Sequence, residues 1–126
     1  MTDPAKFSPS EYAIGIGLDL AAIKIKEQGD PPVPVDGMTF GVASMSENSP
    51  HGGEMHPDGD EVLYLISGRV NVVFLDSPQP DIVMKPGEGL VVPKGVWHRV
   101  DILEPCQIVY LTPGPNNQFR PLVDDT

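Results

Sequence analysis

Short apolar runs separated by turn residues recur along most of the chain. Within each run, apolar residues alternate with polar ones or continue for a few positions, as in half-buried and buried strands. No window repeats apolar residues at positions i, i+3, i+4 and i+7 over several turns, so we expect little helix. This rhythm predicts an all-β sandwich or barrel. The predicted strands cover residues 20–26, 38–46, 61–67, 69–76, 81–85, 89–93, 96–103 and 106–112.

The residues between the runs indicate how these strands are connected. The chain has 15 prolines and 13 glycines, and they are spread between the apolar runs rather than pooled in one tract. Gly68 predicts a hairpin that joins 61–67 to 69–76. The proline-rich stretch 27–37 predicts a long loop, because prolines exclude helix there, and 47–53 predicts a turn.

The length of 126 residues fits one domain with a core of its own. We expect a loose N-terminal arm over residues 1–19, in which YAIGIG (12–17) is also a candidate for extended structure. A β-barrel domain is expected over 20–113, followed by a polar, irregular tail over 114–126. The single cysteine, Cys106, excludes an intrachain disulfide and fits a small core residue.

Charge and apolar content limit the classes of partner. The chain carries 18 acidic and 8 basic residues, a net charge of −10, which disfavours binding to nucleic acids and to anionic membrane surfaces. The start MTDPAKFSPSEY has no basic segment followed by an apolar core, so we do not expect a secretory signal. No apolar run approaches the roughly 20 residues of a spanning helix. The sequence therefore predicts a cytoplasmic protein.

Four acidic and histidine side chains are predicted to face the interior. Side chains two positions apart on a strand share a face, so Glu54 and His56 in GEMHP project together. His98 lies between two valines of the same face in VWHRV, and Glu61 shares its face with leucines in EVLYLIS. Buried carboxylates and imidazoles need partners. A divalent cation would satisfy all four of them.

Each of these residues also has a plainer explanation. His98 fits a hydrogen-bonded core histidine, and His56 fits a turn residue that faces water. Glu61 would serve equally as a partner for Arg69, and Glu54 as a solvent-facing charge. The stretch HPDGDE on its own would then be only a polar turn.

The spacing around HPDGDE resembles a motif of the cupin family. His56-x4-Glu61-x6-Gly68 matches the second half of the first cupin motif, G-x5-H-x-H-x3,4-E-x6-G. Two positions depart from it: the first histidine is Glu54, and the leading glycine is Asn48. Glutamate is also a metal ligand, and a more anionic set favours harder ions such as Fe(II) or Mn(II). The alternative is that the site has lost its metal and persists as a hydrogen-bonded cluster.

A second stretch resembles the other cupin motif, G-x5-P-x-G-x2-H-x3-N. Gly87-x5-Pro93-x-Gly95-x2-His98 matches it up to its last position, which is Ile102 here. The glycines allow positive φ angles at turns, and the proline limits where a strand can pair. The two motifs occur in the expected order, and the resemblance covers about residues 38–112.

The resemblance implies a double-stranded β-helix, or jelly-roll, barrel with a divalent metal in its mouth. His56, Glu61 and His98 match family ligands, Glu54 is a candidate fourth, and Fe, Mn, Ni or Zn is the expected ion. The family includes dioxygenases, isomerases, decarboxylases and lyases, so the fold alone does not select a reaction. A binding module without catalysis and a structural protein with a closed pocket are the alternatives. Family members commonly form homodimers, so the resemblance implies one here.

The few basic residues of the chain lie in turns, at strand starts or on faces away from the predicted ligands. The pocket is therefore predicted to be apolar and to suit a small neutral or aromatic molecule rather than a phosphosugar. Candidate lining residues are Leu63, Leu65, Val73, Val91 and Val100.

Overall fold

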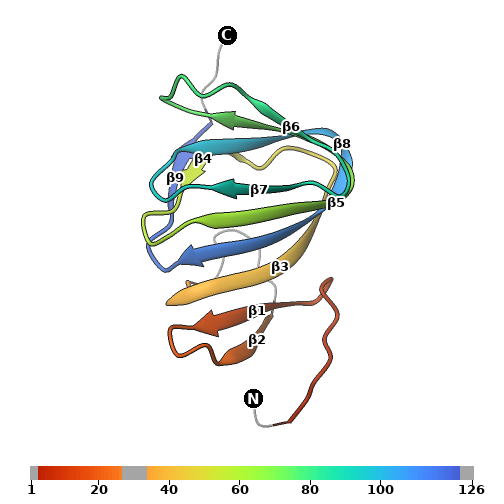
Figure 1. Cartoon of the computed structure of the whole chain (residues 1–126). Helices are drawn as coiled ribbons and strands as arrows, with labels where there is room; N and C mark the ends of the chain where they lie inside the picture. The colour runs from red at the N-terminus through yellow and green to blue at the C-terminus, as the bar shows by residue number, and fades with distance from the viewer. Residues whose placement is uncertain (1–2, 27–33, 123–126) are drawn as a thin grey trace.

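The computed structural model describes residues 3–26 and 34–122, and every strand pair within them is antiparallel. These residues contain no helix, and so none that spans a membrane. The all-β prediction is confirmed (Figure 1). The strands are β1 (Tyr12–Gly17), β2 (Ala22–Lys26), β3 (Gly37–Met45), β4 (His51–Met55), β5 (Glu61–Phe74), β6 (Ile82–Met84), β7 (Gly89–Val92), β8 (His98–Gly114) and β9 (Gln118–Pro121).

Strands β5 and β8 pair along most of their length, and we call this pair the long ribbon. In its first half, β5 residues 61–67, the ribbon is flanked by β7 on one side and by β3, β1 and β2 on the other. In its second half, β5 residues 69–74, it is flanked by β6 and by β4 and β9. The ribbon thus takes part in two sheets, which build the jelly-roll barrel.

The ribbon bends at Gly68, where we had predicted a hairpin, and that prediction is wrong. Strand β5 continues through Gly68 with a φ of +83°, and β8 likewise continues through the break predicted at Glu104-Pro105. The register shifts three times between Leu65 and Val70. A Cβ at Gly68 would lie 2.2 Å from the Pro105 oxygen, so glycine permits both the bend and the close approach of β8.

The core lies between the two sheets and is built mainly by the long ribbon. On β5, alternate residues are buried in both halves, as the period of a strand requires. Cys106 is one of the buried residues, as predicted. The cluster consists of Leu63, Leu65, Val70, Val72, Phe74, Met84, Val92, Cys106 and Ile108. Its members come from both halves of the ribbon and from β6 and β7, so the core fixes the distance between the sheets.

Two segments that we predicted to be irregular contain strands. Strand β4 lies partly in the turn predicted over 47–53, and β9 lies in the predicted tail. Strand β1 coincides with residues 12–17 of the predicted arm, the stretch for which extended structure was a candidate. The strands formed by HGGEM and QFRP were not recognisable from the sequence, because glycine and proline weaken the apolar pattern. Residues 27–33 of the predicted loop and 123–126 of the tail lie outside the described residues. Predicted strands 20–26, 38–46, 81–85 and 89–93 correspond to β2, β3, β6 and β7.

Candidate metal centre

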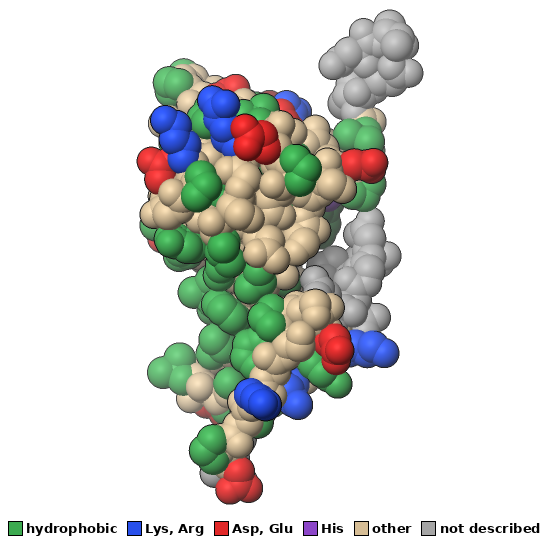
Figure 2. All heavy atoms as spheres, turned by 90° about the vertical axis from the view of Figure 1, so that its right-hand side faces the viewer, with side chains coloured by type: hydrophobic (Ala, Val, Ile, Leu, Met, Phe, Trp, Pro, Cys, Tyr) green, Lys and Arg blue, Asp and Glu red, His purple; other side chains and the backbone are tan. Residues whose placement is uncertain are grey.

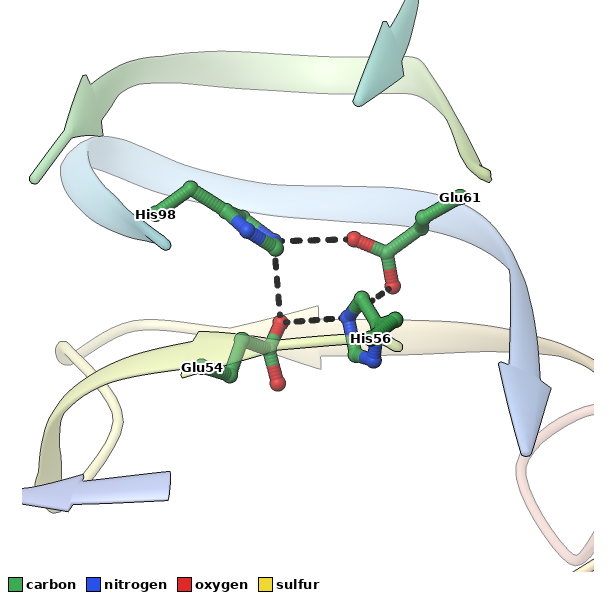
Figure 3. Close-up of side chains that lie close together, drawn as sticks. All are labelled: Glu54, His56, Glu61 and His98. Atoms are coloured by element: carbon green, nitrogen blue, oxygen red, sulfur yellow. Dashed lines mark hydrogen bonds and ion pairs between the residues drawn. The ribbon is translucent and has the colours of Figure 1, made fainter. Parts of the chain in front are cut away.

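Four side chains converge at one end of the barrel (Figure 3). Glu54 comes from β4, His56 from the residue after that strand, Glu61 from the start of β5, and His98 from the start of β8. One potential ligand atom from each of them lies within 4.8 Å of all the others. The inward orientation and convergence predicted from strand parity are therefore present in the structure.

The bend of the long ribbon brings these residues together. His98 lies opposite Phe74, at the end of β5, whereas Glu61 begins that strand. A straight strand of this length would separate its ends by roughly 40 Å. Because the ribbon folds over at Gly68, Glu61 and His98 instead face each other across the barrel. Glu54 joins them because it lies opposite His98 in the pairing of β4 with β8.

Backbone hydrogen bonds tie together the turns that carry the two sequence motifs. The Gly95 N–H donates to the His56 carbonyl at 3.0 Å. The Lys94 N–H donates to Asp60 Oδ1 at 2.7 Å. Asp60 therefore caps the neighbouring turn in addition to shaping its own, as turn aspartates often do. Gly68, Gly87 and Gly95 all have positive φ angles, and Pro93 directly follows β7, so the motif residues expected at turns and bends lie at such positions.

The distances within the cluster are short and its members are well buried. His98 Nε2 lies 3.0 Å from Glu61 Oε1 and 3.4 Å from Glu54 Oε1. His56 Nε2 lies 3.3 Å from Glu61 Oε2 and 3.7 Å from Glu54 Oε1. The side chains of the two histidines and Glu61 are at most 4% exposed, whereas that of Glu54 is 25% exposed. Glu54 is therefore the member closest to solvent.

Hydrogen bonds from outside the cluster orient three of its members. His98 Nδ1 donates to the Val96 carbonyl at 3.1 Å. Thr112 Oγ1 donates to Glu61 Oε2 at 2.6 Å. His56 Nδ1 lies 2.9 Å from Asn117 Oδ1.

Neither Thr112 nor Asn117 was among the residues predicted from the sequence. Thr112 shares strand parity with the buried Ile108, so its inward position was available from the sequence. Asn117 carried no comparable signal, because β9 was not predicted.

The pKa values show how strongly the four groups interact. Burial alone lowers the pKa of His56, but the carboxylates of Glu54 and Glu61 outweigh burial and raise it to about 10. Burial also lowers the pKa of His98, and the same carboxylates raise it to about 9. Burial raises the pKa of Glu54, yet the two histidines lower it to about 2, and they lower that of Glu61 as well. The metal-free cluster therefore holds two carboxylates and two imidazolium groups near neutral pH.

A divalent cation fits this donor set. His56 Nε2 is buried and has no hydrogen-bond partner, although it points at two carboxylates. Ligand bonds of about 2.0–2.2 Å place neighbouring donor atoms roughly 3.0–3.4 Å apart, close to the distances found here. Two imidazoles and two carboxylates suit Fe, Mn, Ni or Zn. A cation would replace the two protons that the metal-free cluster carries.

The predicted pocket residues do not all face the interior. Leu63 and Leu65 are buried in the core, and Val100 lies opposite the buried Val72. Val91, in contrast, is 56% exposed, and its neighbour Val92 is the buried residue of β7. The prediction for Val91 is therefore wrong, because the parity of β7 is shifted by one position.

Val73 was also assigned to the wrong face, since it lies between the buried residues Val72 and Phe74. His51 is half-buried at the start of β4. Its ring centroid lies 5.2 Å from that of Phe119.

Hollows of about 620 and 380 Å³ lie along the β1–β2 hairpin, and neither is lined by a predicted pocket residue.

Comparisons with known proteins agree with this architecture. The chain is 32% identical over 80 residues to germin-like protein subfamily 3 member 2 of Arabidopsis thaliana, a match that covers 62% of this chain and 35% of that protein. The chain therefore spans about a third of the length of this relative. It is also similar to a solved cupin-2 domain containing protein from Shewanella frigidimarina, with 27% identity and a TM-score of 0.53, covering 65% of this chain and 76% of that one.

A more distant structure, DMSP lyase from Ruegeria pomeroyi, shares the fold. Its identity is 18% and its TM-score is 0.55, with 72% of this chain and 47% of that chain covered. The family model described as cupin domain matches residues 42–112, which is more than half of the chain and includes both motifs. With this match, two sheets joined by a bent ribbon and a histidine–glutamate cluster in the barrel, the chain belongs to the cupin family.

Proposed function

We propose that the protein is a metal-dependent enzyme that holds a divalent first-row ion between Glu54, His56, Glu61 and His98. The reaction classes that we propose are dioxygenase-like oxidation, isomerisation or lyase chemistry. The substrate that we propose is a small apolar or aromatic molecule. Known relatives of this fold include a lyase, but the likeness at that identity concerns the fold alone.

The observation that carries the proposal is the convergence of four potential ligands in which the buried Nε2 atom of His56 faces two carboxylates without forming a hydrogen bond. An imidazole nitrogen at such a depth ordinarily has a hydrogen-bond partner. His56 is 3% exposed, and its Nε2 faces the two carboxylates without a hydrogen bond. A cation in the middle of the cluster would satisfy this atom and the negative charges together.

Each residue of the cluster would have a separate role in an enzyme of this kind. His56 and His98 would hold the ion as neutral imidazoles through Nε2, and Glu61 would be held in place by Thr112. Glu54, the most exposed member, would border the side from which a substrate would arrive. When bound, the ion would supply Lewis acidity and, if redox-active, electrons for chemistry with O2.

The distribution of basic residues supports an uncharged substrate. Arg99 forms an ion pair with Asp101 through two hydrogen bonds. Arg120 is paired with Asp76 and stacks over Trp97. These two guanidinium groups are thus engaged with neighbouring side chains. The proposed ion could itself bind one anionic group, but neither of these arginines is free to hold a second one. We therefore propose a neutral molecule rather than a phosphosugar or dicarboxylate.

A non-catalytic binding protein with a degenerate site is the second candidate. It is favoured by the 3.0 Å hydrogen bond between His98 Nε2 and Glu61 Oε1, which engages two potential ligand atoms with each other. With two imidazolium groups and two carboxylates the cluster is neutral and stable without a metal. Glu54 in place of the usual first histidine would then mark a site that no longer binds an ion.

Metal analysis distinguishes the two candidates. We would purify the protein without a tag and measure bound metals by mass spectrometry, beside His98→Ala and His51→Ala. His51 lies on β4 but outside the cluster, so its variant is the matched control. We expect about one first-row ion per chain in the wild type and the control. In His98→Ala the metal affinity should fall by more than about 100-fold, which is the largest loss typical of removing a hydrogen-bond partner of a ligand.

The enzyme proposal fails if the wild type binds no ion after anaerobic loading with Fe(II), Mn(II), Ni(II) or Zn(II). If it binds metal but shows no oxygen uptake, isomerase or lyase activity with small aromatic and apolar compounds, the binding protein is the better description.

We also propose that the protein works in the cytoplasm as a homodimer. The outer face of the first half of the ribbon supports the dimer, because Val62, Tyr64 and Ile66 are 41%, 44% and 43% exposed. Figure 2 shows hydrophobic side chains gathered through the middle of one side of the molecule, between regions that carry more charge. Light scattering coupled to size-exclusion chromatography tests this part of the proposal.

A further inference from the structure

The C-terminal segment after β8 reaches the metal centre, although it lies beyond residues 42–112 that the family model matches. Strand β9 pairs antiparallel with β4, with Glu54 opposite Phe119 and Met55 opposite Gln118. Continued by one position, this register places Asn117 beside His56. Directly opposed residues of an antiparallel pair project to the same face, so Asn117 points to the side on which His56 lies.

Asn117 and His56 are in direct contact. Asn117 Oδ1 lies 2.9 Å from His56 Nδ1, across 61 positions of sequence. An amide oxygen can only accept, so the hydrogen of this bond belongs to Nδ1. In a neutral His56, the lone pair is then on Nε2, the atom that faces Glu54 and Glu61.

The two histidines of the cluster are oriented in different ways. His98 donates from Nδ1 to the carbonyl of Val96, two residues earlier in the same turn. This bond comes from the second motif itself. His56 depends on a side chain from another strand, so its orientation is supplied by a part of the chain outside both motifs.

Further contacts hold the segment around Asn117 in place. The backbone N–H and the side-chain amide of Asn116 donate to Asp58 at 2.7 and 2.9 Å. Arg120 stacks over the Trp97 ring at 4.2 Å and forms an ion pair with Asp76. Asn117 is thus fixed on both sides, by the turn that follows His56 and by the residue that precedes His98.

We propose that Asn117 is a positioning residue of the metal centre. It holds the His56 ring with its hydrogen on Nδ1 and its Nε2 lone pair toward the ion. This inference rests on the proposed function. Outer hydrogen-bond partners of this kind typically contribute 10- to 100-fold to metal affinity, because they fix the tautomer and the direction of the ligand ring.

The test compares three variants in Zn(II) titrations against a chromophoric chelator. Asn117→Leu removes the acceptor at similar size, and we expect a loss of about 10- to 100-fold in affinity. Asn117→Asp keeps an acceptor oxygen at the same place and should restore most of the affinity. Gln118→Ala, an exposed neighbour on β9, is the control and should bind like the wild type.

A spectroscopic readout separates positioning from a general structural effect. In long-range ¹H–¹⁵N spectra of the Zn(II)-loaded wild type, we expect His56 to bind through Nε2 and to show a slowly exchanging Nδ1 proton. Asn117→Leu should lose this slow exchange, while His98, which donates to Val96, should keep its own.

Wild-type affinity and an unchanged His56 signal in Asn117→Leu would overturn the role of Asn117 alone. Equal losses in Asn117→Leu and Asn117→Asp would also overturn it, because the acceptor would then not matter. A wild type that binds none of Fe(II), Mn(II), Ni(II) and Zn(II) would overturn the proposed function together with this inference.

Discussion

The two halves of the long ribbon have similar inner faces but different outer faces. In the first half, the outer side chains of β5 are Val62, Tyr64 and Ile66, all more than 40% exposed. In the second half, the corresponding positions are Arg69, Asn71 and Val73, and Asn71 lies opposite Asp101. The inner faces contribute alike to the core, so burial does not distinguish the halves. The outer faces do differ. All three outer residues of the first half are apolar, which suits a protein contact, whereas two of the three in the second half are polar, which suits contact with water.

A change of pH is expected to have the largest effect on stability. It alters the electrostatic attraction between the charged residues at the far ends of the two halves. Glu61 begins the first half, and His98 pairs with the end of the second. In the metal-free protein the pKa values of His56 and His98 are raised from 6.5 to about 10 and about 9. The folded state therefore holds protons that the unfolded state releases. This stabilisation is complete below pH 6.5 and is lost as the pH rises through 9 to 10.

Urea unfolding of the metal-free protein between pH 6 and pH 10 checks this expectation. Each unit of pKa shift corresponds to about 1.4 kcal/mol, so the loss should be easily measured. Glu54→Gln removes one of the two carboxylates and should move the fall in stability to lower pH. A flat profile in the wild type would contradict the ion pairs of the cluster. Metal binding near pH 7 should release about two protons, measurable by calorimetry in two buffers.

The next largest effect is expected at the bend between the halves. Gly68→Ala introduces a Cβ at a φ of +83°, only 2.6 Å from the Cys106 Cα. The left-handed backbone and the crowding together should cost about 2–5 kcal/mol. Metal affinity should fall as well, because the bend places Glu61 opposite His98.

Gly87→Ala is the matched control for the bend. Gly87 has a similar φ of +88°, but nothing lies within 4 Å of a Cβ there. Only the backbone penalty of about 1–2 kcal/mol should remain, with metal affinity unchanged. Equal costs for the two variants in thermal or urea unfolding would show that the contact between β5 and β8 at Gly68 is not important.

The smallest effect on stability is expected on the outer faces. Ile66→Lys changes a residue that is 43% exposed, and Val83→Lys changes one that is equally exposed on β6, beside the second half. Both should alter the free energy of unfolding by less than about 1 kcal/mol. Only Ile66→Lys should shift the protein from dimer to monomer in light scattering. A wild-type monomer, or equal effects of both variants, would contradict our interpretation of the apolar face.

The site was predictable from the sequence to the extent that its residues lie in regular strands with motif spacing. His56, Glu61 and His98 follow from two spaced motifs, and the inward direction of Glu54 follows from strand parity. Val91 shows the limit of parity, because a run apolar at every position does not reveal which residues face inward. Asn117 shows a second limit of prediction from sequence. It directly precedes β9, a four-residue strand that is too short and too close to prolines to show an alternating pattern.

Local sequence patterns were enough to predict the strand-rich class, the inward positions of Leu63 and Leu65 on β5, and the four groups of the cluster. These depend on side-chain periodicity and residue chemistry, which are local properties. Only the tertiary structure decided that Gly68 bends a continuous strand, that Glu61 and His98 face each other, and that Asn117 orients His56. These depend on contacts between residues far apart in the chain, which local patterns do not encode because the pairing of distant strands is fixed by the packing of the whole barrel.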